Sequence, residues 1–264
     1  MDLQLRGKTA IVTGGGSNIG RGISLTLARE GANVVIADIG GEGAKKVADQ
    51  ANAQGGGKAI VVRCDVTDYQ NVEAMVNRAA QEFGQVHVLV NNVGWTIDRL
   101  FLQKPREEWQ QEVNLNLWSV INGCRAVLPH MIEKGYGHIV SIGSDAGRMG
   151  EFREVVYGAC KSGVIGLSKA LAREVGRYGI TVNVVCPGLV IPSEEEMGEQ
   201  SIWRDPDLRA TFTPENLEKA AQRYPLRRLG TAQEIADAVT FFASEAARHV
   251  TGQTLSVSGG YTMM

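Results

Sequence analysis

Short runs of β-branched apolar residues alternate with helix-patterned stretches along almost the whole chain. The apolar runs lie near residues 9–13, 33–37, 59–64, 86–90, 138–142, 180–186 and 254–258. Helical patterns fill residues 19–30, 42–54, 105–134, 155–178 and 231–247, and another begins after residue 68. Runs that are apolar throughout suit parallel strands covered on both faces. The alternation predicts an α/β fold with a doubly wound, mostly parallel, seven-stranded sheet.

One segment interrupts this alternation and affects how the chain is divided. The chain has 264 residues, and no linker or solenoid-like repeat splits it, so we expect a single domain over residues 1–264. Residues 188–225 are rich in proline and charge and carry little strand signal. Loops of this length are commonly lids or disordered segments. We interpret residues 188–225 as a substrate lid, with a passive surface excursion as the alternative.

Charge and composition exclude several partners. The net charge is −2 and no basic stripe occurs, so we expect no nucleic-acid partner. No apolar stretch approaches the ~18 residues of a membrane span, and the run at residues 10–12 is too short for a signal peptide. We therefore expect a cytoplasmic protein with no membrane partner. The four cysteines and four histidines lack metal-ligand spacing, so we expect buried free thiols and no metal site.

A glycine-rich turn follows the first predicted strand, between Thr13 and Gly22. It opens onto a helix N-terminus, where free N–H groups and the helix dipole favour an anion. Glycine also lets a pyrophosphate come close to the backbone. Neither a strict GxGxxG nor a GxxxxGK[ST] sequence occurs here. A dinucleotide site is the functional interpretation, and a simple tight turn is the alternative.

Five motifs, in order, resemble those of the short-chain dehydrogenase/reductase family between Leu5 and Gly260. They are Thr13-Gly14 with Gly20 (TGxxxGxG), Asn91-Asn92-Val93-Gly94 (NNAG), Asn116 seven residues after Trp109, Tyr157 with Lys161 (YxxxK) and Ser144 thirteen residues earlier, and Pro187-Gly188 (PG). The resemblance implies a Rossmann-type fold and a nicotinamide cofactor. It also implies interconversion of a small-molecule secondary alcohol and a ketone by hydride transfer.

The resemblance also implies which residues hold the cofactor. They are Gly14, Ser17, Asn18, Ile19, Gly20, Asp38, Asp65, Val66, Asn92, Gly94, Tyr157, Lys161, Pro187, Gly188 and Val190. Two positions depart from the family pattern. Asn18 replaces the middle turn glycine, and asparagine tolerates left-handed backbone better than most residues. Pro192 replaces a hydroxyl residue that helps hold the nicotinamide carboxamide, and the adjacent Ser193 is a candidate substitute.

The cofactor is predicted to be NAD. Asp38 ends the second strand, eighteen residues after Gly20, where an acidic residue accepts hydrogen bonds from the adenosine ribose. Its charge would repel a 2′-phosphate. The turn also offers no lysine or arginine before Arg21. By resemblance, Asp65 meets the adenine amino group.

Catalysis is assigned to Asn116, Ser144, Tyr157 and Lys161. Tyr157 and Lys161 are four residues apart and so share one helix face. A tyrosine pKa near ~10 is too high for a base at neutral pH, and a nearby ammonium and the positive nicotinamide favour the phenolate. Tyr157 then takes the alcohol proton, and Ser144 positions the reacting oxygen. The resemblance implies that Lys161 holds the nicotinamide ribose and that Asn116 links Lys161 to water.

Substrate recognition is assigned to Trp95, Arg148 and Arg153. The arginines suit a carboxylate or phosphate, unless they are surface residues paired with Glu151 and Glu154. The sequence around Trp95 and Ser144 resembles alicyclic β-hydroxyacyl-CoA dehydrogenases, which implies a cyclic or aromatic β-hydroxyacyl-CoA. A free ketone, a steroid, a sugar and an acyl-carrier-protein thioester are the alternatives.

Two other functional classes compete with the enzyme. One is a dinucleotide-binding partner or sensor subunit without turnover, and the other is a nucleic-acid-binding α/β domain. The predicted catalytic residues argue against the first, and the mild acidity argues against the second. The family resemblance further implies a homotetramer that packs through the helices near 105–134 and 155–178.

Overall fold

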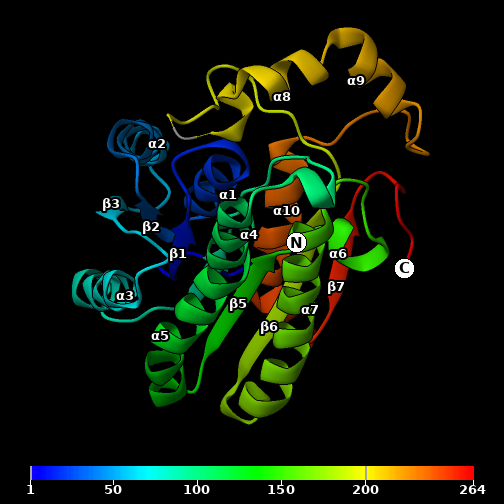
Figure 1. The fold of residues 1–264 in the computed structure, drawn as a ribbon. Coiled ribbons are helices and arrows are strands. Elements are labelled where there is room, and N and C mark those ends of the chain that lie inside the picture. The colour runs from blue at the N-terminus through cyan, green and yellow to red at the C-terminus, as the bar shows by residue number, and fades with distance from the viewer. Residues whose placement is uncertain (1, 200) are drawn as a thin grey trace.

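Seven parallel strands form one sheet at the centre of the structure, a computed structural model that describes residues 2–199 and 201–264. The strands are β1 (Thr9–Thr13), β2 (Asn33–Asp38), β3 (Ala59–Arg63), β4 (Val88–Asn91), β5 (Gly137–Ile142), β6 (Ile180–Pro187) and β7 (Thr254–Val257). Their order is β3-β2-β1-β4-β5-β6-β7 (Figure 1). The chain reverses direction across the sheet between β1 and β4, which creates a switch point where ligands bind in such folds.

Helices cover both faces of the sheet. The helices are α1 (Asn18–Arg29), α2 (Gly41–Ala53), α3 (Tyr69–Phe83), α4 (Arg106–Val113), α5 (Ser119–Lys134), α6 (Ala146–Met149), α7 (Val155–Val175), α8 (Pro206–Thr211), α9 (Pro214–Ala221) and α10 (Ala232–Phe242). One core lies between the sheet and helices α1, α2 and α10, and the other between the sheet and helices α3, α5 and α7. The predicted doubly wound α/β fold is confirmed.

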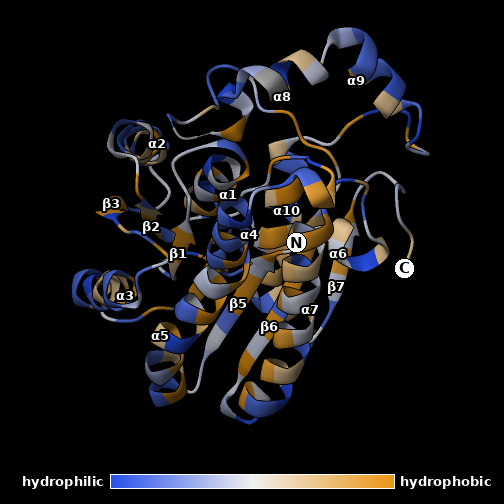
Figure 2. Cartoon of the chain, viewed as in Figure 1, coloured by the Kyte–Doolittle hydropathy of each residue, from blue (hydrophilic) through white to orange (hydrophobic). Residues whose placement is uncertain are grey.

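The alternation of side chains along the strands explains their uninterrupted apolar sequences. In β1, Ala10 and Val12 enter the first core, whereas Ile11 enters the second. Successive residues point to opposite faces of a strand, and both faces are covered here. Figure 2 shows the resulting band of hydrophobic residues through the sheet and the inward helix faces.

The long helix predicted over 105–134 is divided by a π-helical turn, Asn114–Trp118. The side chain of Asn116 provides a reason. Its amide donates to the Glu112 carbonyl at 2.9 Å, and it thus occupies an acceptor that the backbone of a regular helix would use. Such turns are frequent at functional sites.

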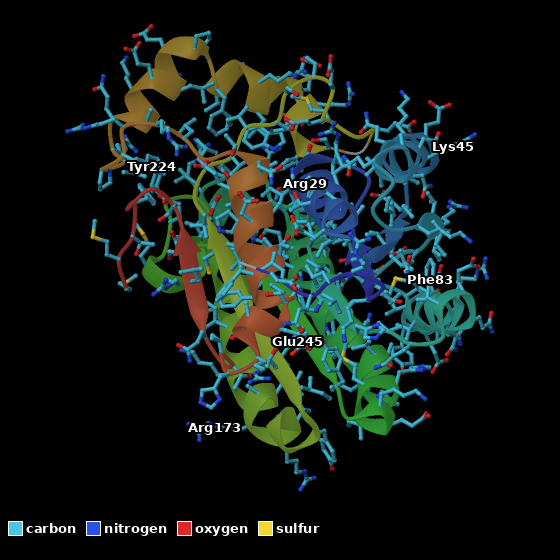
Figure 3. The ribbon with its side chains drawn as sticks, turned by 180° about the vertical axis from the view of Figure 1, so that it is seen from behind. Arg29, Lys45, Phe83, Arg173, Tyr224 and Glu245 are labelled. Carbon is cyan, nitrogen blue, oxygen red and sulfur yellow. The ribbon has the colours of Figure 1, made fainter. Side chains whose placement is uncertain are left out.

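Residues 188–225 leave the sheet after β6 and carry a 3-10 turn (Ile202–Arg204), α8 and α9. Figure 1 shows this segment arching across the end of the sheet above α1 and α10. Tyr224 lies at this end of the molecule, whereas Arg173 lies at the opposite end (Figure 3). No helix in the described part of the chain is long and apolar enough to cross a membrane.

Candidate active site

A cavity of about 780 Å³ opens at the carboxyl ends of β1, β2, β4, β5 and β6. It is lined by all the cofactor residues expected from the sequence except Gly20, and also by Ser144, Trp95 and Arg153. Asn116 and Arg148 do not line it. The parallel strands therefore bring most of the predicted site residues to one end of the sheet.

The glycine turn is shaped by close backbone contacts. Gly14 has a φ of +62°, and its N–H donates to Ala37 O at 2.7 Å. A Cβ on Gly20 would lie 2.0 Å from the Gly14 carbonyl oxygen, so Gly20 shapes the turn rather than the cavity wall. Asn18 has a φ of +48°, the left-handed backbone that its residue type was expected to tolerate.

Asp38 is fixed at the cavity wall by two backbone N–H groups. Gly16 N–H donates to Oδ2 and Gly40 N–H to Oδ1, both at 2.9 Å. Asp65 also lines the cavity, and its Oδ1 accepts from the Thr67 N–H at 2.9 Å. These bonds hold both carboxylates in place at the β2 and β3 ends of the cavity.

The two residues expected from the NNAG-like motif have structural tasks. The Asn92 amide donates to the carbonyls of Thr13 and Gly14 at 2.9 and 3.2 Å, so it joins β4 to the glycine turn. A Cβ on Gly94 would lie 3.1 Å from Asn116 Oδ1 and 3.2 Å from Lys161 Nζ. Glycine at this position therefore lets the Lys161 ammonium approach the β4 end.

Ser144, Tyr157 and Lys161 meet beside the ends of β5 and β6. Tyr157 and Lys161 lie on the first turns of α7, and the Ser144 hydroxyl hydrogen-bonds to Tyr157. Lys161 is 2% exposed. Its Nζ donates to Ile142 O at 2.9 Å and lies 5.5 Å from the centroid of the Tyr157 ring.

Burial dominates the electrostatics of this group. It lowers the pKa of Lys161 to about 8. Burial, followed by the negative charge of Glu154, raises the pKa of Tyr157 above its ordinary value, and the hydrogen bond with Ser144 opposes this rise. Phenolate formation therefore requires positive charge to offset burial and Glu154.

Asn116 is fully buried in the π-helical turn. Its amide Nδ2 donates to Trp95 O at 2.7 Å and to Glu112 O, and its Oδ1 accepts from the Trp95 N–H at 3.1 Å. One amide hydrogen thus holds the loop after β4 and the other bonds to α4, so both are used. The link from Asn116 to Lys161 through water stays a prediction, and it would have to use an acceptor oxygen of Asn116.

Comparison with known proteins identifies the chain. A family model described as "Enoyl-(Acyl carrier protein) reductase" matches residues 14–262. The 3-oxoacyl-[acyl-carrier-protein] reductase FabG of Escherichia coli (strain K12) is 39% identical over 262 residues, which cover 99% of this chain and 100% of the relative. The chain belongs to the short-chain dehydrogenase/reductase family. It is an oxidoreductase of alcohols and ketones that uses a nicotinamide dinucleotide.

Two further relatives bear the same name. The FabG of Vibrio cholerae is 37% identical over 262 residues, which cover 99% of this chain and 100% of the relative. That of Staphylococcus aureus (strain N315) is 36% identical over 257 residues, which cover 97% and 98%. The names of these relatives specify a 3-oxoacyl-[acyl-carrier-protein] as the substrate of those proteins and give no support to a cyclic acyl-CoA.

The residues present fit the cofactor of this dehydrogenase/reductase family. At Gly14, Gly16 and Gly20 an added side chain would crowd neighbouring atoms, so the turn presents backbone alone at these positions. The Asp38 carboxylate is anchored on the same cavity wall. Val190 is buried and forms a parallel bridge with Gly230 beside Pro187 and Gly188. Among the described residues, no group of three or more histidine, cysteine, aspartate and glutamate side chains is placed to hold a metal ion.

Arg148 does not line the cavity, and its role in substrate recognition stays a prediction. Its Nη1 donates to the Ser256 hydroxyl at 2.6 Å, and Ser256 in turn donates to the buried Asp145 carboxylate. These bonds hold the guanidinium at the Ser256 hydroxyl of β7. Ser193, the candidate substitute near the nicotinamide, is exposed and outside the cavity lining, whereas Pro192 lines it.

The alternative pairing of Arg148 and Arg153 with Glu151 and Glu154 is also not observed. Glu151 accepts from the Tyr261 hydroxyl at 2.7 Å and the Phe152 N–H at 3.0 Å. No ion pair within the described ranges involves Glu151 or Glu154. Arg153 lines the cavity.

Sequence reasoning gave no individual role to several members of the cavity wall. They include Asp98 and Glu154, together with Leu208, Phe212 and Tyr224 from the segment 188–225 that was interpreted as a lid. Most come from irregular segments whose course no local pattern specifies. Glu154 had a signal, because it lies three residues before Tyr157, the spacing of neighbours on one helix face.

Proposed function

We propose that this protein is an NAD-dependent reductase that converts a 3-oxoacyl thioester, carried on an acyl carrier protein, into the 3-hydroxyacyl thioester and can run the reverse reaction. The observation that carries the proposal is the meeting of Ser144, Tyr157 and Lys161 at one end of the dinucleotide-sized cavity. The names of the relatives support the substrate class.

Each side chain has a proposed task in the reaction. A bound nicotinamide dinucleotide supplies or accepts the hydride. Tyr157 gives its proton to the ketone oxygen in reduction and takes it back in oxidation. Ser144 hydrogen-bonds to the same oxygen and fixes its position. The buried Lys161 ammonium favours the phenolate and binds the nicotinamide ribose.

Asp38 supports the choice of NAD. Its carboxylate is fixed by two N–H groups at the end of β2 and lines the cavity, so it can accept hydrogen bonds from the ribose hydroxyls. A 2′-phosphate at ~4 Å would meet a repulsion of a few kcal/mol at moderate effective dielectric.

The lid and the homotetramer are further parts of the proposal. In support of a lid, the Glu196 carbonyl accepts from the Asn18 N–H at 2.8 Å, and the Asn18 amide donates to Ser201 Oγ at 3.1 Å. These contacts fasten residues 188–225 to the phosphate-binding turn. In support of subunit contacts, Leu102 and Trp118 are 94% and 50% exposed near α4 and α5.

A direct test is NADH oxidation with 3-oxobutanoyl thioesters of acyl carrier protein and of CoA, with NADPH as the matched cofactor. We expect turnover with NADH and a preference for the carrier-protein thioester. Turnover of 2-hydroxycyclohexanecarboxyl-CoA with NAD⁺, and of neither 3-oxobutanoyl thioester, would overturn the proposed substrate class. Tight NADH binding without turnover of any of these would instead favour the sensor alternative.

A further inference from the structure

Two carboxyl groups meet in the cavity without a task in the proposed reaction. Asp98 lies in the loop after β4, and Glu154 is the residue that precedes α7. The Arg99 N–H donates to Arg153 O at 3.3 Å, which joins the two segments. Both carboxyl groups line the cavity together with Tyr157, and their side chains hydrogen-bond to each other.

Neither carboxyl group forms an ion pair with a basic side chain in residues 2–199 and 201–264. The nearby Lys104 is buried and bonded to the carboxylate of Glu112. A hydrogen bond between two carboxyl groups requires a proton on one of them, and two carboxylates in contact cannot both ionise readily.

The environment of the pair favours retention of that proton. Burial has the largest effect on Glu154, followed by the negative charges of Asp98 and Glu151. Together they raise the pKa of Glu154 to about 8, against the opposing effect of Lys104. The charged and titratable groups around the pair are Asp98, Lys104, Glu112, Glu151, Arg153, Glu154, Tyr157, Lys161 and Cys186. The positive charges of Arg153 and Lys104 lower the pKa of Asp98 and so favour its ionised form, which leaves the shared proton on Glu154.

Glu154 also acts on the proposed proton donor. It lies just before the first turn of α7, three residues before Tyr157. After burial, its negative charge is the largest influence on the Tyr157 hydroxyl. A change in the charge of the pair therefore changes how readily Tyr157 releases its proton.

We propose that Asp98 and Glu154 form a proton-sharing pair that sets the charge beside the Tyr157 hydroxyl, with Glu154 as a positioning residue for proton transfer. This inference rests on the proposed role of Tyr157. While the pair holds its proton, Glu154 is neutral and the phenolate is easier to form. When the proton leaves, a second negative charge stands beside the phenolate.

The first test observes the proton directly and needs no substrate. Infrared spectra of the wild-type protein should show a protonated carboxyl group at pH 7 that is absent in Glu154→Gln. In Asp98→Asn this signal should titrate at lower pH, because the negative charge of Asp98, which helps to retain the proton, is gone, while the amide oxygen keeps a hydrogen-bond acceptor at that position. A Glu154 carboxyl group already ionised at pH 7 in the wild type would overturn the proposal.

The second test is the pH profile of kcat/KM for oxidation of the 3-hydroxybutanoyl thioester of acyl carrier protein. Glu154→Gln should move the limb that reports the Tyr157 phenolate to lower pH, by about one unit for a neighbouring charge in a protein. Glu154→Asp should return it toward the wild-type position. Glu73→Gln, on the exposed face of α3, is the matched control and should leave the profile unchanged.

The outcomes separate this inference from the proposed function. If Tyr157→Phe keeps full turnover, the proposed function fails, while the infrared titration still decides whether the pair shares a proton. If Tyr157→Phe is inactive but Glu154→Gln leaves the pH profile in place, the proposed function stands and the role of Glu154 is overturned.

Discussion

Gly94 and Lys161 are in such close contact that a Cβ on the glycine would lie 3.2 Å from the lysine Nζ. Few real Cβ contacts are this short, so a larger residue would have to push the ammonium away from Ile142 O and from the Tyr157 ring. Gly94 therefore matters because the absence of a side chain leaves space for the Lys161 ammonium.

The first prediction concerns this contact. Gly94→Ala should lower kcat/KM by about tenfold or more, because a displacement of the catalytic groups by a fraction of an ångström weakens the transition-state interactions. Steady-state kinetics of thioester reduction measures the loss. Gly176→Ala, with nothing within 4 Å of the added Cβ, is the control. Equal rates for both variants would contradict the fit argument.

The second prediction tests the proton donor. Tyr157→Phe removes the hydroxyl that bonds to Ser144 and should lower turnover by about 10²–10⁴-fold, the usual contribution of a general acid or base. NADH binding, measured by fluorescence titration, should stay within a few-fold of the wild type. A comparable loss of both would indicate that the substitution damages the fold.

The third prediction tests cofactor choice at Asp38. Asp38→Asn keeps an acceptor for one backbone N–H and removes the negative charge at the cavity wall. The ratio of kcat/KM for NADPH to that for NADH should rise by about tenfold or more, because removal of a repulsion of a few kcal/mol exceeds the ~1.4 kcal/mol that corresponds to tenfold. Asp49→Asn, on the exposed surface of α2, should leave the ratio unchanged. A constant ratio in Asp38→Asn would remove the basis for NAD selectivity.

The fourth prediction concerns stability in acid. Burial lowers the pKa of His87 and of His138 from 6.5 to about 4. Nearby Lys8 acts in the same direction on both, while the negative charge of Glu245 opposes the shift at His138. The unfolded chain takes up protons as the pH falls through 6.5, whereas the folded chain takes them up only near 4. The contribution of His87 and His138 to the free energy of unfolding is therefore complete above about pH 6.5 and is lost as the pH falls toward 4.

Urea unfolding at pH 7.5, 6 and 5 measures this loss. His138 is bonded to Thr181 and Tyr136, so His138→Asn should be less stable at pH 7.5 and should lose less further stability on acidification. The exposed His249 provides the control, His249→Gln, in which the free energy of unfolding should fall with pH as in the wild type. The same fall with pH in His138→Asn as in the wild type would exclude His138 as a source of the acid sensitivity.

The strands and the meeting of Tyr157 with Lys161 were predictable because their signals are local. A strand covered on both faces must be apolar throughout, as β1 and β2 are, and Tyr157 and Lys161 lie one helical turn apart. The left-handed backbone of Asn18 followed from its residue type.

Contacts between distant segments were not predictable in this way. Arg148 bonds to Ser256 because β7 places that hydroxyl beside Asp145. No local sequence pattern predicts this contact. Asp98 and Glu154 pair only because the loop after β4 meets the segment before α7. The π-helical turn at Asn116 likewise depends on a tertiary contact with Trp95.

The two ends of the parallel sheet have different tasks. The cavity lies at the carboxyl ends of the strands, whereas His87 and His138 lie at or before the starts of β4 and β5. Tolerance of acid and choice of substrate can therefore change independently. A lineage that adapts to a new habitat can accumulate substitutions at one end of the sheet, and a lineage that acquires a new substrate can do so at the other, without trading one property against the other.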